Sequence, residues 1–347
     1  MHCSNPMKKN PGKFHLLKPL QEWIKIPFED HPPKKCLFRV DAGNYFGLSF
    51  GHLSRCLILA KVFKEIFDSE CLFLMKDFNE GIQQAIISGI QVKKLPKNVT
   101  YRYFISKFVL DYKPDCLIVD LPYPDENMSI YIELKKYGVK FFFIDDNRYH
   151  NPGADVYLNS QLLAHKKLQQ NKLNNTIYFL GPEYFIFDET LIEKTFPIPE
   201  NDCFNIVLSF GGSDPTNLMM KTVKELVNTQ YLNNRYYIIL GPGYMKQSAL
   251  KTIIDKYDNF FLVHNPENII PYFQSSDFVI CAGGRTIYEL LYLKKNFMPI
   301  ASAPHETDAI SELFENNLIQ YGMKQWSPKE FVSNLKKIVK KEHYASS

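Results

Sequence analysis

The sequence predicts an α/β protein with two successive doubly wound domains. Short apolar runs alternate with longer segments of helical period, the alternation stops at a polar stretch, and it then restarts. Parallel strands need a crossover segment between them, usually a helix, so this alternation is typical of parallel sheets. The polar stretch DETLIEKTFPIPEND (188–202) has two prolines and no clear period, and we expect it to be the linker.

The first domain is expected to span residues 36–187, after a Pro- and Lys-rich N-terminal extension at 1–35. A helix after its first strand places Leu53, Cys56, Leu57, Ala60, Phe63 and Phe67 on one stripe at helical spacing. The strands of this domain are expected at 36–40, 71–75, 90–95, 116–120, 140–145, 154–160 and 176–181.

The second domain is expected at residues 203–326, followed by a helix near 328–341 within a C-terminal segment, 327–347. That last helix carries Phe331, Leu335, Ile338 and Val339 on one face, and we expect it to pack back on one of the two domains, with either one open at this point. The strands of this domain are expected at 204–210, 236–240, 260–264, 277–282 and 297–301.

The composition indicates an ordinary globular protein and disfavours nucleic-acid-binding, secreted and membrane-spanning proteins. Of 347 residues, 45% are hydrophobic and 22% charged, as in ordinary globular proteins. A net charge of +4, without a basic stripe, does not indicate a nucleic-acid partner but suits an anionic small molecule. The seven cysteines form no C-x-x-C pair, which favours a reducing compartment, and we expect a cytoplasmic protein. No apolar run approaches the ~18 residues of a membrane span.

Three glycine-bearing turns follow predicted strands: GLSFGH (47–52), FGGSDPTN (210–217) and AGGRTIYE (282–289). Glycine lets backbone amides approach a ligand, and a helix that begins just afterwards offers unpaired N–H groups to a phosphate. One such turn occurs in many α/β proteins simply to reverse the chain, but three together favour a phosphate-bearing ligand. Neither a Walker pattern nor G-x-G-x-x-G is present, which disfavours ATPases and dinucleotide enzymes. We expect the ligand in a cleft at the carboxyl ends of both sheets.

The segments FRVDAGNYFGLSFGHLSRCLILA, VLSFGGSDPTN and ICAGGRTIYELLYLKKNFMPI carry a resemblance to a known family. They look like the UDP-2,4-diacetamido-2,4,6-trideoxy-β-L-altropyranose hydrolases of pseudaminic acid biosynthesis. That family is related to spore coat polysaccharide proteins and to the lipid-II-forming N-acetylglucosaminyltransferase. The similarity extends from about Cys36 to Met323. It implies a GT-B-like arrangement of two Rossmann-type domains, in which the C-terminal one binds the nucleotide and the N-terminal one acts on the sugar.

The resemblance also implies roles for single residues. His52 falls on the family's catalytic histidine, and Glu289 on the glutamate that accepts hydrogen bonds from ribose hydroxyls. Three features depart from the family, and one of them is His305–Glu306, where relatives often carry an Asn–Gln pair. Gly47 and Gly51 are separated by three residues, as in the transferase loop, and Arg285 replaces a small hydroxyl residue, where it either binds the diphosphate or points away. The expected nucleotide-binding residues are Gly211, Gly212, Ser213, Asp214, Gly283, Gly284, Arg285, Thr286 and Glu289.

The chemistry expected at His52 is general-base catalysis. Histidine can accept a proton from water at neutral pH, and the start of a helix favours the neutral imidazole that a base requires. Water attacking the anomeric carbon would invert that centre and release the nucleotide. With a sugar or lipid hydroxyl in place of water, the same site would be that of a glycosyltransferase. The alternative is a histidine that only caps the helix or satisfies the core.

Each of the other residues considered for substrate binding has an alternative, purely structural role. Asp41 and Asp146 either bind sugar substituents or close their loops, and Asn159 either reaches an acetamido group or completes its strand end. His305 either contacts the ligand or caps the helix of residues 309–314. No spacing indicates a metal site, and no cofactor is implied. The candidate substrate-binding residues are Asp41, Gly51, Tyr123, Asp146, Asn159 and His305.

Three functions follow in order of preference. The first is a hydrolase that releases UDP from a UDP-linked, acetamido-substituted deoxy sugar on the way to a nonulosonic acid or surface polysaccharide. The second is an inverting glycosyltransferase that uses a UDP-sugar donor. The third is a non-catalytic protein that binds a nucleotide sugar and associates with pathway enzymes.

Overall fold

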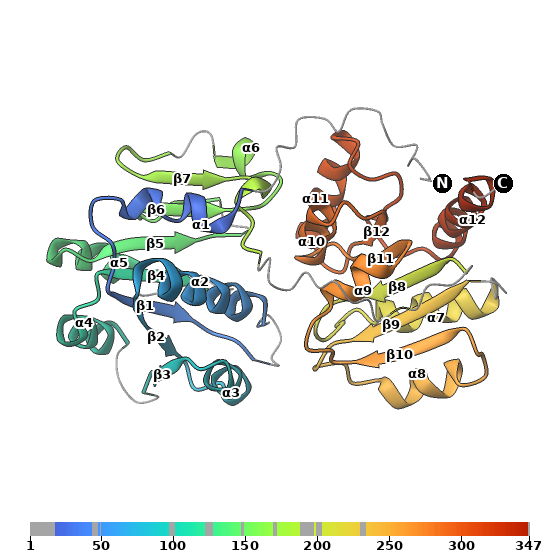
Figure 1. Cartoon of the computed structure of the whole chain (residues 1–347), viewed down its shortest axis with the longest axis horizontal. Helices are drawn as coiled ribbons and strands as arrows, with labels where there is room; N and C mark the ends of the chain where they lie inside the picture. Colours follow the sequence, from blue (N-terminus) through green and yellow to red (C-terminus); the bar gives the residue numbers. More distant parts are fainter. Residues whose placement is uncertain are drawn as a thin grey trace. The chain divides into compact units, whose positions relative to one another are not determined.

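The computed structural model describes residues 18–43, 48, 50–96, 101–121, 128–146, 149–168, 172–187, 198, 203–229 and 234–345. The chain divides into two compact units at about residue 190 (Figure 1). We call them the N-terminal and the C-terminal unit. Each contains its own parallel sheet, and strands alternate with helices along the chain, which confirms the predicted fold class.

The N-terminal unit contains a seven-stranded sheet in the order β3-β2-β1-β4-β5-β6-β7, with every neighbouring pair parallel. Its central strands are buried on both faces, which is why they read as continuous apolar runs. β4 has the predicted bounds. The strands are β1 (Lys35–Val40), β2 (Glu70–Met75), β3 (Gln91–Lys94), β4 (Cys116–Asp120), β5 (Lys140–Ile144), β6 (Val156–Asn159) and β7 (Ile177–Leu180).

Helices cover both faces of this sheet (Figure 1). Successive side chains of a strand point to opposite faces. Thus Phe38 of β1 packs in one cluster with α1, α2 and α3, whereas the preceding residue, Leu37, packs with α4, α5 and α6. The helices are α1 (Leu20–Trp23), α2 (Gly51–Phe67), α3 (Asn79–Ile87), α4 (Tyr101–Tyr112), α5 (Met128–Leu134) and α6 (Ala164–Leu168), with 3₁₀ turns η1 (Ile26–Phe28), η2 (Lys135–Tyr137) and η3 (Pro182–Tyr184).

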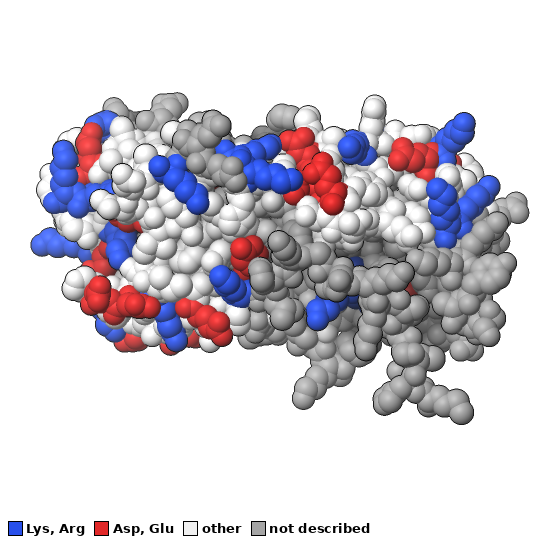
Figure 2. Space-filling model, turned by 90° about the horizontal axis from the view of Figure 1, so that it is seen from above, with Lys and Arg blue, Asp and Glu red and all other residues white. Residues whose placement is uncertain are grey.

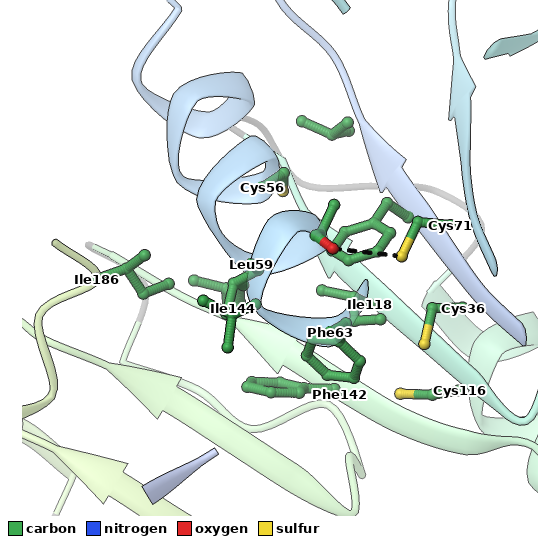
Figure 3. Close-up of a cluster of buried hydrophobic side chains, with 14 of the residues drawn as sticks. Cys36, Cys56, Leu59, Phe63, Cys71, Cys116, Ile118, Phe142, Ile144 and Ile186 are labelled. Carbon is green, nitrogen blue, oxygen red and sulfur yellow. Dashed lines mark hydrogen bonds between the residues drawn. The ribbon is translucent and has the colours of Figure 1, made fainter. Parts of the chain in front are cut away.

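Helix α2 is the central element of the first cluster, and its apolar stripe lies on the sheet (Figure 3). Cys71, Cys36 and Cys116 lie at matching register positions on the adjacent strands β2, β1 and β4. All three are buried free thiols, and burial raises the pKa of the Cys116 thiol. They therefore fill the core as small apolar groups, as their apolar surroundings in the sequence suggest.

Part of the N-terminal extension belongs to this core. Leu20, Trp23 and Phe28 are buried in the α2 cluster, and the rings of Trp23 and Phe179 have centroids 4.8 Å apart. The expected domain boundary at residue 36 therefore falls inside the packed unit. Burying two large aromatic side chains stabilises the docking of this segment by roughly 3–6 kcal/mol.

The C-terminal unit contains a five-stranded parallel sheet in the order β10-β9-β8-β11-β12. The strands are β8 (Asn205–Ser209), β9 (Arg235–Leu240), β10 (Phe260–His264), β11 (Phe278–Ala282) and β12 (Phe297–Ile300). The helices are α7 (Leu218–Asn228), α8 (Gln247–Ile254), α9 (Ile270–Ser275), α10 (Thr286–Tyr292), α11 (Pro304–Glu315) and α12 (Pro328–Ala345). Phe331, Leu335 and Ile338 of α12 pack in one cluster with α7, so the last helix belongs to this unit.

The charged side chains of the described residues are mixed over the surface. Figure 2 shows basic and acidic groups interspersed on the face it presents. This mixture agrees with the small net charge of +4. Among the described residues, no helix has both the length and the apolar character needed to cross a bilayer.

Candidate active site

The sheet topology of the N-terminal unit brings the segments that follow β1, β4 and β5 to one edge. β1 and β4 are neighbours, and from this pair the strand order runs outward in opposite directions. Ligands of open α/β sheets bind at such a switch point, beyond the carboxyl ends of the strands. His52 lies at the start of α2, the helix that follows β1; Asp120 is the last residue of β4, and Asp146 follows β5. These side chains meet there.

The start of α2 supplies three groups to this site. Arg55 and Cys56 follow His52 by three and four positions. Their side chains therefore lie on the same side of the first helical turns as that of His52. All three contact the carboxylate of Asp120. The loop that precedes α2 is described only in part, and Gly47 lies outside the described residues.

Asp120 is fully buried and accepts several hydrogen bonds. Its Oδ1 lies 2.7 Å from Nδ1 of His52 and 2.5 Å from Nη2 of Arg55. Its Oδ2 lies 2.5 Å from Nε of Arg55 and 3.6 Å from Sγ of Cys56. Burial by itself would raise the pKa of Asp120, but the charge of Arg55 and the hydrogen bonds from Arg55 and His52 outweigh burial and hold it well below its usual range.

Arg55 joins Asp120 to the second carboxylate of the site. Its Nη1 donates to Oδ1 of Asp146 at 2.6 Å, and Nη2 lies 3.0 Å from Oδ2. Burial opposes the charged state of the Asp146 carboxyl, but the attraction of Arg55 and His52 lowers its pKa. For Arg55, the two aspartates overcome the opposing effect of burial and raise the guanidinium pKa. The cluster thus holds two ionised carboxylates against one permanent cation.

The hydrogen bond to Asp120 decides the tautomer of His52. If Nδ1 were unprotonated, its lone pair would face a carboxylate oxygen 2.7 Å away, which is repulsive. We therefore assign the proton to Nδ1, which donates to Asp120 although Nη2 of Arg55 also approaches it at 2.9 Å. Nε2 then carries the free lone pair. The side chain of His52 is 13% exposed, so part of the imidazole remains accessible.

The remaining candidates of the N-terminal unit lie in different surroundings. Asn159 is buried and donates from Nδ2 to the backbone carbonyl of Asp146 at 3.1 Å, so it helps to hold that loop. Asp41 is also buried, but its carboxylate pairs with Arg39 at 2.7 Å and accepts the backbone N–H of Lys76. Tyr123 lies outside the described residues, and Gly51 is the first residue of α2.

The C-terminal unit places two glycine turns at its own switch point, after the adjacent strands β8 and β11. In the first turn, Gly211 has a φ of 79°, and Gly211, Gly212 and Ser213 are exposed. Asp214 is buried, which raises its pKa, and accepts the N–H groups of Leu218 and Met219, each at 2.8 Å. The start of α7 is therefore already occupied by this carboxylate. The exposed turn itself offers the backbone amides.

A third glycine loop supports the first turn. A Cβ atom on Gly241 would lie 2.4 Å from Cα of Gly212, and the N–H of Gly243 donates to the Gly212 carbonyl at 2.8 Å. Only a residue without a side chain allows this approach at position 241. This loop is not among the three predicted glycine turns, although its Gly-Pro-Gly follows a predicted strand.

The second turn, at Gly283 and Gly284, has an acidic neighbourhood. Glu306 packs against both glycines, and its Oε2 accepts the backbone N–H of Ser302 at 2.6 Å and the Ser302 hydroxyl at 2.8 Å. Arg285 precedes α10, which begins at Thr286, and its Nε lies 3.4 Å from Oε1 of Glu289.

Burial raises the pKa of Glu289, an effect that the Arg285 charge only partly offsets. Arg285 is thus paired locally. His305 is exposed at the second position of α11. Within the described ranges, no group of three or more His, Cys, Asp or Glu side chains is arranged to hold a metal ion.

Two residues of the candidate site, Asp120 and Arg55, could not be singled out from the sequence. A signal existed for each: an aspartate ends the apolar run CLIVD, and an arginine follows His52 by three positions. Neither signal is specific, because which strands are neighbours in the sheet decides whether the two residues meet.

Solved structures show the class of fold. MurG of Acinetobacter baumannii has a TM-score of 0.61 at 12% identity, covering 88% of this chain and 91% of its own. The Staphylococcus aureus MnaA–UDP structure also has a TM-score of 0.61, at 11% identity, covering 88% of both chains. At such identities the likeness establishes the fold alone. With two Rossmann-like units, the protein has the GT-B fold.

Sequence comparison identifies its relatives, although a scan against protein-family models found no match. The chain is a homologue of the UDP-2,4-diacetamido-2,4,6-trideoxy-beta-L-altropyranose hydrolase of Campylobacter jejuni, with 26% identity over 274 residues, 77% of this chain and 91% of the relative. It is also similar to spore coat polysaccharide biosynthesis protein SpsG of Bacillus subtilis, with 23% identity over 38% of this chain and 40% of the relative.

An uncharacterized protein of Methanocaldococcus jannaschii is 28% identical over 256 residues. The match covers 71% of this chain and 51% of that protein, so the chain spans about half the length of this relative. These relatives confirm the resemblance inferred from the three sequence segments.

Proposed function

We propose that the protein is an enzyme that hydrolyses a nucleotide sugar, and specifically that it releases UDP from a UDP-linked, acetamido-substituted deoxy sugar. The observation that carries this proposal is the geometry of His52. Nδ1 is held by the buried Asp120 at 2.7 Å, which leaves Nε2 as a base at a partly exposed position. The homologous hydrolase of Campylobacter jejuni suggests the class of substrate.

In the proposed reaction, Nε2 of His52 accepts a proton from water as the water oxygen attacks the anomeric carbon. The bond from that carbon to the phosphate oxygen breaks on the opposite face, so the configuration inverts. Asp120 and Asp146 stabilise the imidazolium that forms, because both carboxylates remain ionised. Asp120 also keeps the ring in one orientation.

We propose that the C-terminal unit binds the nucleotide. The exposed amides of Gly211, Gly212 and Ser213 suit the diphosphate, and the carboxylate of Glu289 suits ribose hydroxyls, which are hydrogen-bond donors. Backbone donors can stabilise the charge that develops on the leaving diphosphate, so the reaction needs no strong acid. Glu306 adds a second acceptor near the turn at Gly283.

A glycosyltransferase is the second candidate. The three residues between Gly47 and Gly51 resemble the transferase loop, and one structural neighbour is the rhamnosyltransferase SpnG, with a TM-score of 0.59 at 10% identity. In that case, the proton accepted by His52 comes from an acceptor hydroxyl. A protein that binds nucleotide sugars without catalysis is the third.

The test is to incubate the purified protein with a panel of UDP-, CMP- and GDP-sugars in the absence of an acceptor. Release of free sugar together with UDP supports the hydrolase, whereas turnover only after an acceptor is added supports the transferase. His52→Ala should reduce kcat by about two to four powers of ten and leave UDP affinity unchanged. Binding of UDP without any turnover by the unmodified protein would favour the non-catalytic function.

A further inference from the structure

The accessible part of the His52 site presents two hydrogen-bond acceptors side by side. Nε2 of His52 lies 3.9 Å from Oδ2 of Asp146, and the two side chains are 13% and 21% exposed. The donors of Arg55 are directed at the carboxylates of Asp120 and Asp146. A nucleophile that enters here therefore meets a neutral acceptor and a negatively charged one.

The distance between the two acceptors matches the size of one water molecule. At 3.9 Å they are too far apart to hydrogen-bond to each other. Two O–H···acceptor bonds of about 2.8 Å that diverge at roughly a right angle span about 4 Å. One water oxygen can therefore donate to Nε2 and to Oδ2 at the same time.

We infer that Asp146 makes this site selective for water over alcohols as the nucleophile. Water has two O–H groups and satisfies both acceptors. An alcohol has one O–H, so when it donates to Nε2 its carbon substituent faces the Asp146 carboxylate. That carboxylate is then largely covered and loses a charge-assisted hydrogen bond, which is costly. This inference rests on the proposed function and would explain why hydrolysis prevails over transfer.

The bonds of the step balance with the groups present. The water oxygen forms a bond to the anomeric carbon, and the bond from that carbon to the diphosphate oxygen breaks with its electron pair. One water proton moves to Nε2 of His52. The other stays on oxygen, donates to Asp146 throughout, and becomes part of the new sugar hydroxyl.

The experiment measures how the sugar is partitioned between water and methanol. The protein is given the nucleotide sugar that it turns over best, in buffer with and without methanol, and free sugar and methyl glycoside are quantified. We expect the unmodified protein to form methyl glycoside about ten- to a hundredfold less than the molar share of methanol predicts, as the loss of one hydrogen bond to a charged group implies. Methyl glycoside in proportion to methanol would overturn the inference.

The Asp146→Ala variant removes the second acceptor and leaves space for a methyl group. Its product ratio should shift toward methyl glycoside by about ten- to a hundredfold. The ratio is internal to each turnover, so a loss of folded or active protein does not affect it. Asp145→Asn is the matched control, because Asp145 accepts from the Tyr157 hydroxyl at 2.6 Å and lies outside the His52 cluster. Its ratio should be unchanged.

The outcomes separate this inference from the proposed function. If no nucleotide sugar is turned over without an acceptor, the hydrolase proposal itself fails. If free sugar is released but Asp146→Ala keeps the ratio of the unmodified protein, hydrolysis stands and the role of Asp146 is wrong. Should Asp146→Ala be inactive, methyl glycoside formed by the unmodified protein in proportion to methanol would still overturn the inference.

Discussion

Nδ1 of His52 lies 2.7 Å from Oδ1 of Asp120, a carboxylate that is fully buried at the end of the neighbouring strand β4. The contact joins the first turn of α2 to the strand beside β1. It orients the imidazole and assigns the free lone pair to Nε2. The buried carboxylate is thus as much a part of the candidate base as the histidine.

Replacing Asp120 with Asn should lower kcat by about two to four powers of ten, while KM changes little. An amide can present its NH₂ group to Nδ1, which favours the tautomer with the proton on Nε2 and removes the base. Steady-state kinetics on the preferred nucleotide sugar measure the effect, and circular dichroism checks the fold. A variant that is folded and fully active would contradict the orienting role.

Arg55→Met should destabilise the N-terminal unit by about 3–5 kcal/mol, because it leaves two carboxylates largely covered without their cation. Arg102→Met is the matched control. Arg102 pairs with Glu133 at 2.6 Å on the surface, where both side chains are about half exposed, at 49% and 50%. That pair should contribute less than about 1 kcal/mol. Denaturant unfolding measures the free energy of unfolding of both variants. Equal losses of stability would refute the structural role assigned to Arg55.

The acid dependence of stability should depend on Asp146. Its pKa in the folded protein is lowered from the ordinary value of 3.8, against the effect of burial, by Arg55 and His52. As pH falls through this region, the unfolded chain binds the proton first, so the stabilisation present above about pH 4 is lost. Asp146→Asn should therefore be less stable at pH 7, and its deficit should shrink below about pH 4. Unfolding curves between pH 7 and 2 test this, and a deficit that is independent of pH would argue against it.

Gly241→Ala should weaken UDP binding by at least about tenfold, or 1.4 kcal/mol. The added Cβ would lie 2.4 Å from Cα of Gly212 and displace the exposed turn. Gly138→Ala is the control for a strained glycine substitution far from the turn, because Gly138 lies in the other unit and has a φ of 80°, although a Cβ added there would meet no atom within 4 Å. Calorimetric titration with UDP measures both. If both variants bind UDP as tightly as the unmodified protein, the turn does not hold the diphosphate.

Most of the fold could be predicted from the sequence, because parallel strands that are covered on both faces leave a strong local signal. CLIVD at 116–120 is β4 with the predicted bounds, and the stripe through Leu53, Cys56 and Phe63 is the buried face of α2. The same reasoning found His52, since glycine and histidine at a strand–helix junction are a local pattern. The sequence contains only a weak signal that Trp23 packs into the core, because this packing depends on residues distant in the sequence, such as Phe179.

The sequence by itself determined the strand–helix order, the two-unit organisation and the choice of His52, since each is encoded by neighbours along the chain. Only the tertiary structure decided what surrounds that histidine. Asp120 and Asp146 lie 68 and 94 positions beyond it, and the pairing of β1 with β4 and of β4 with β5 brings them together. The physical reason is that strand order is set by the packing of whole helices on the sheet, which no single segment specifies.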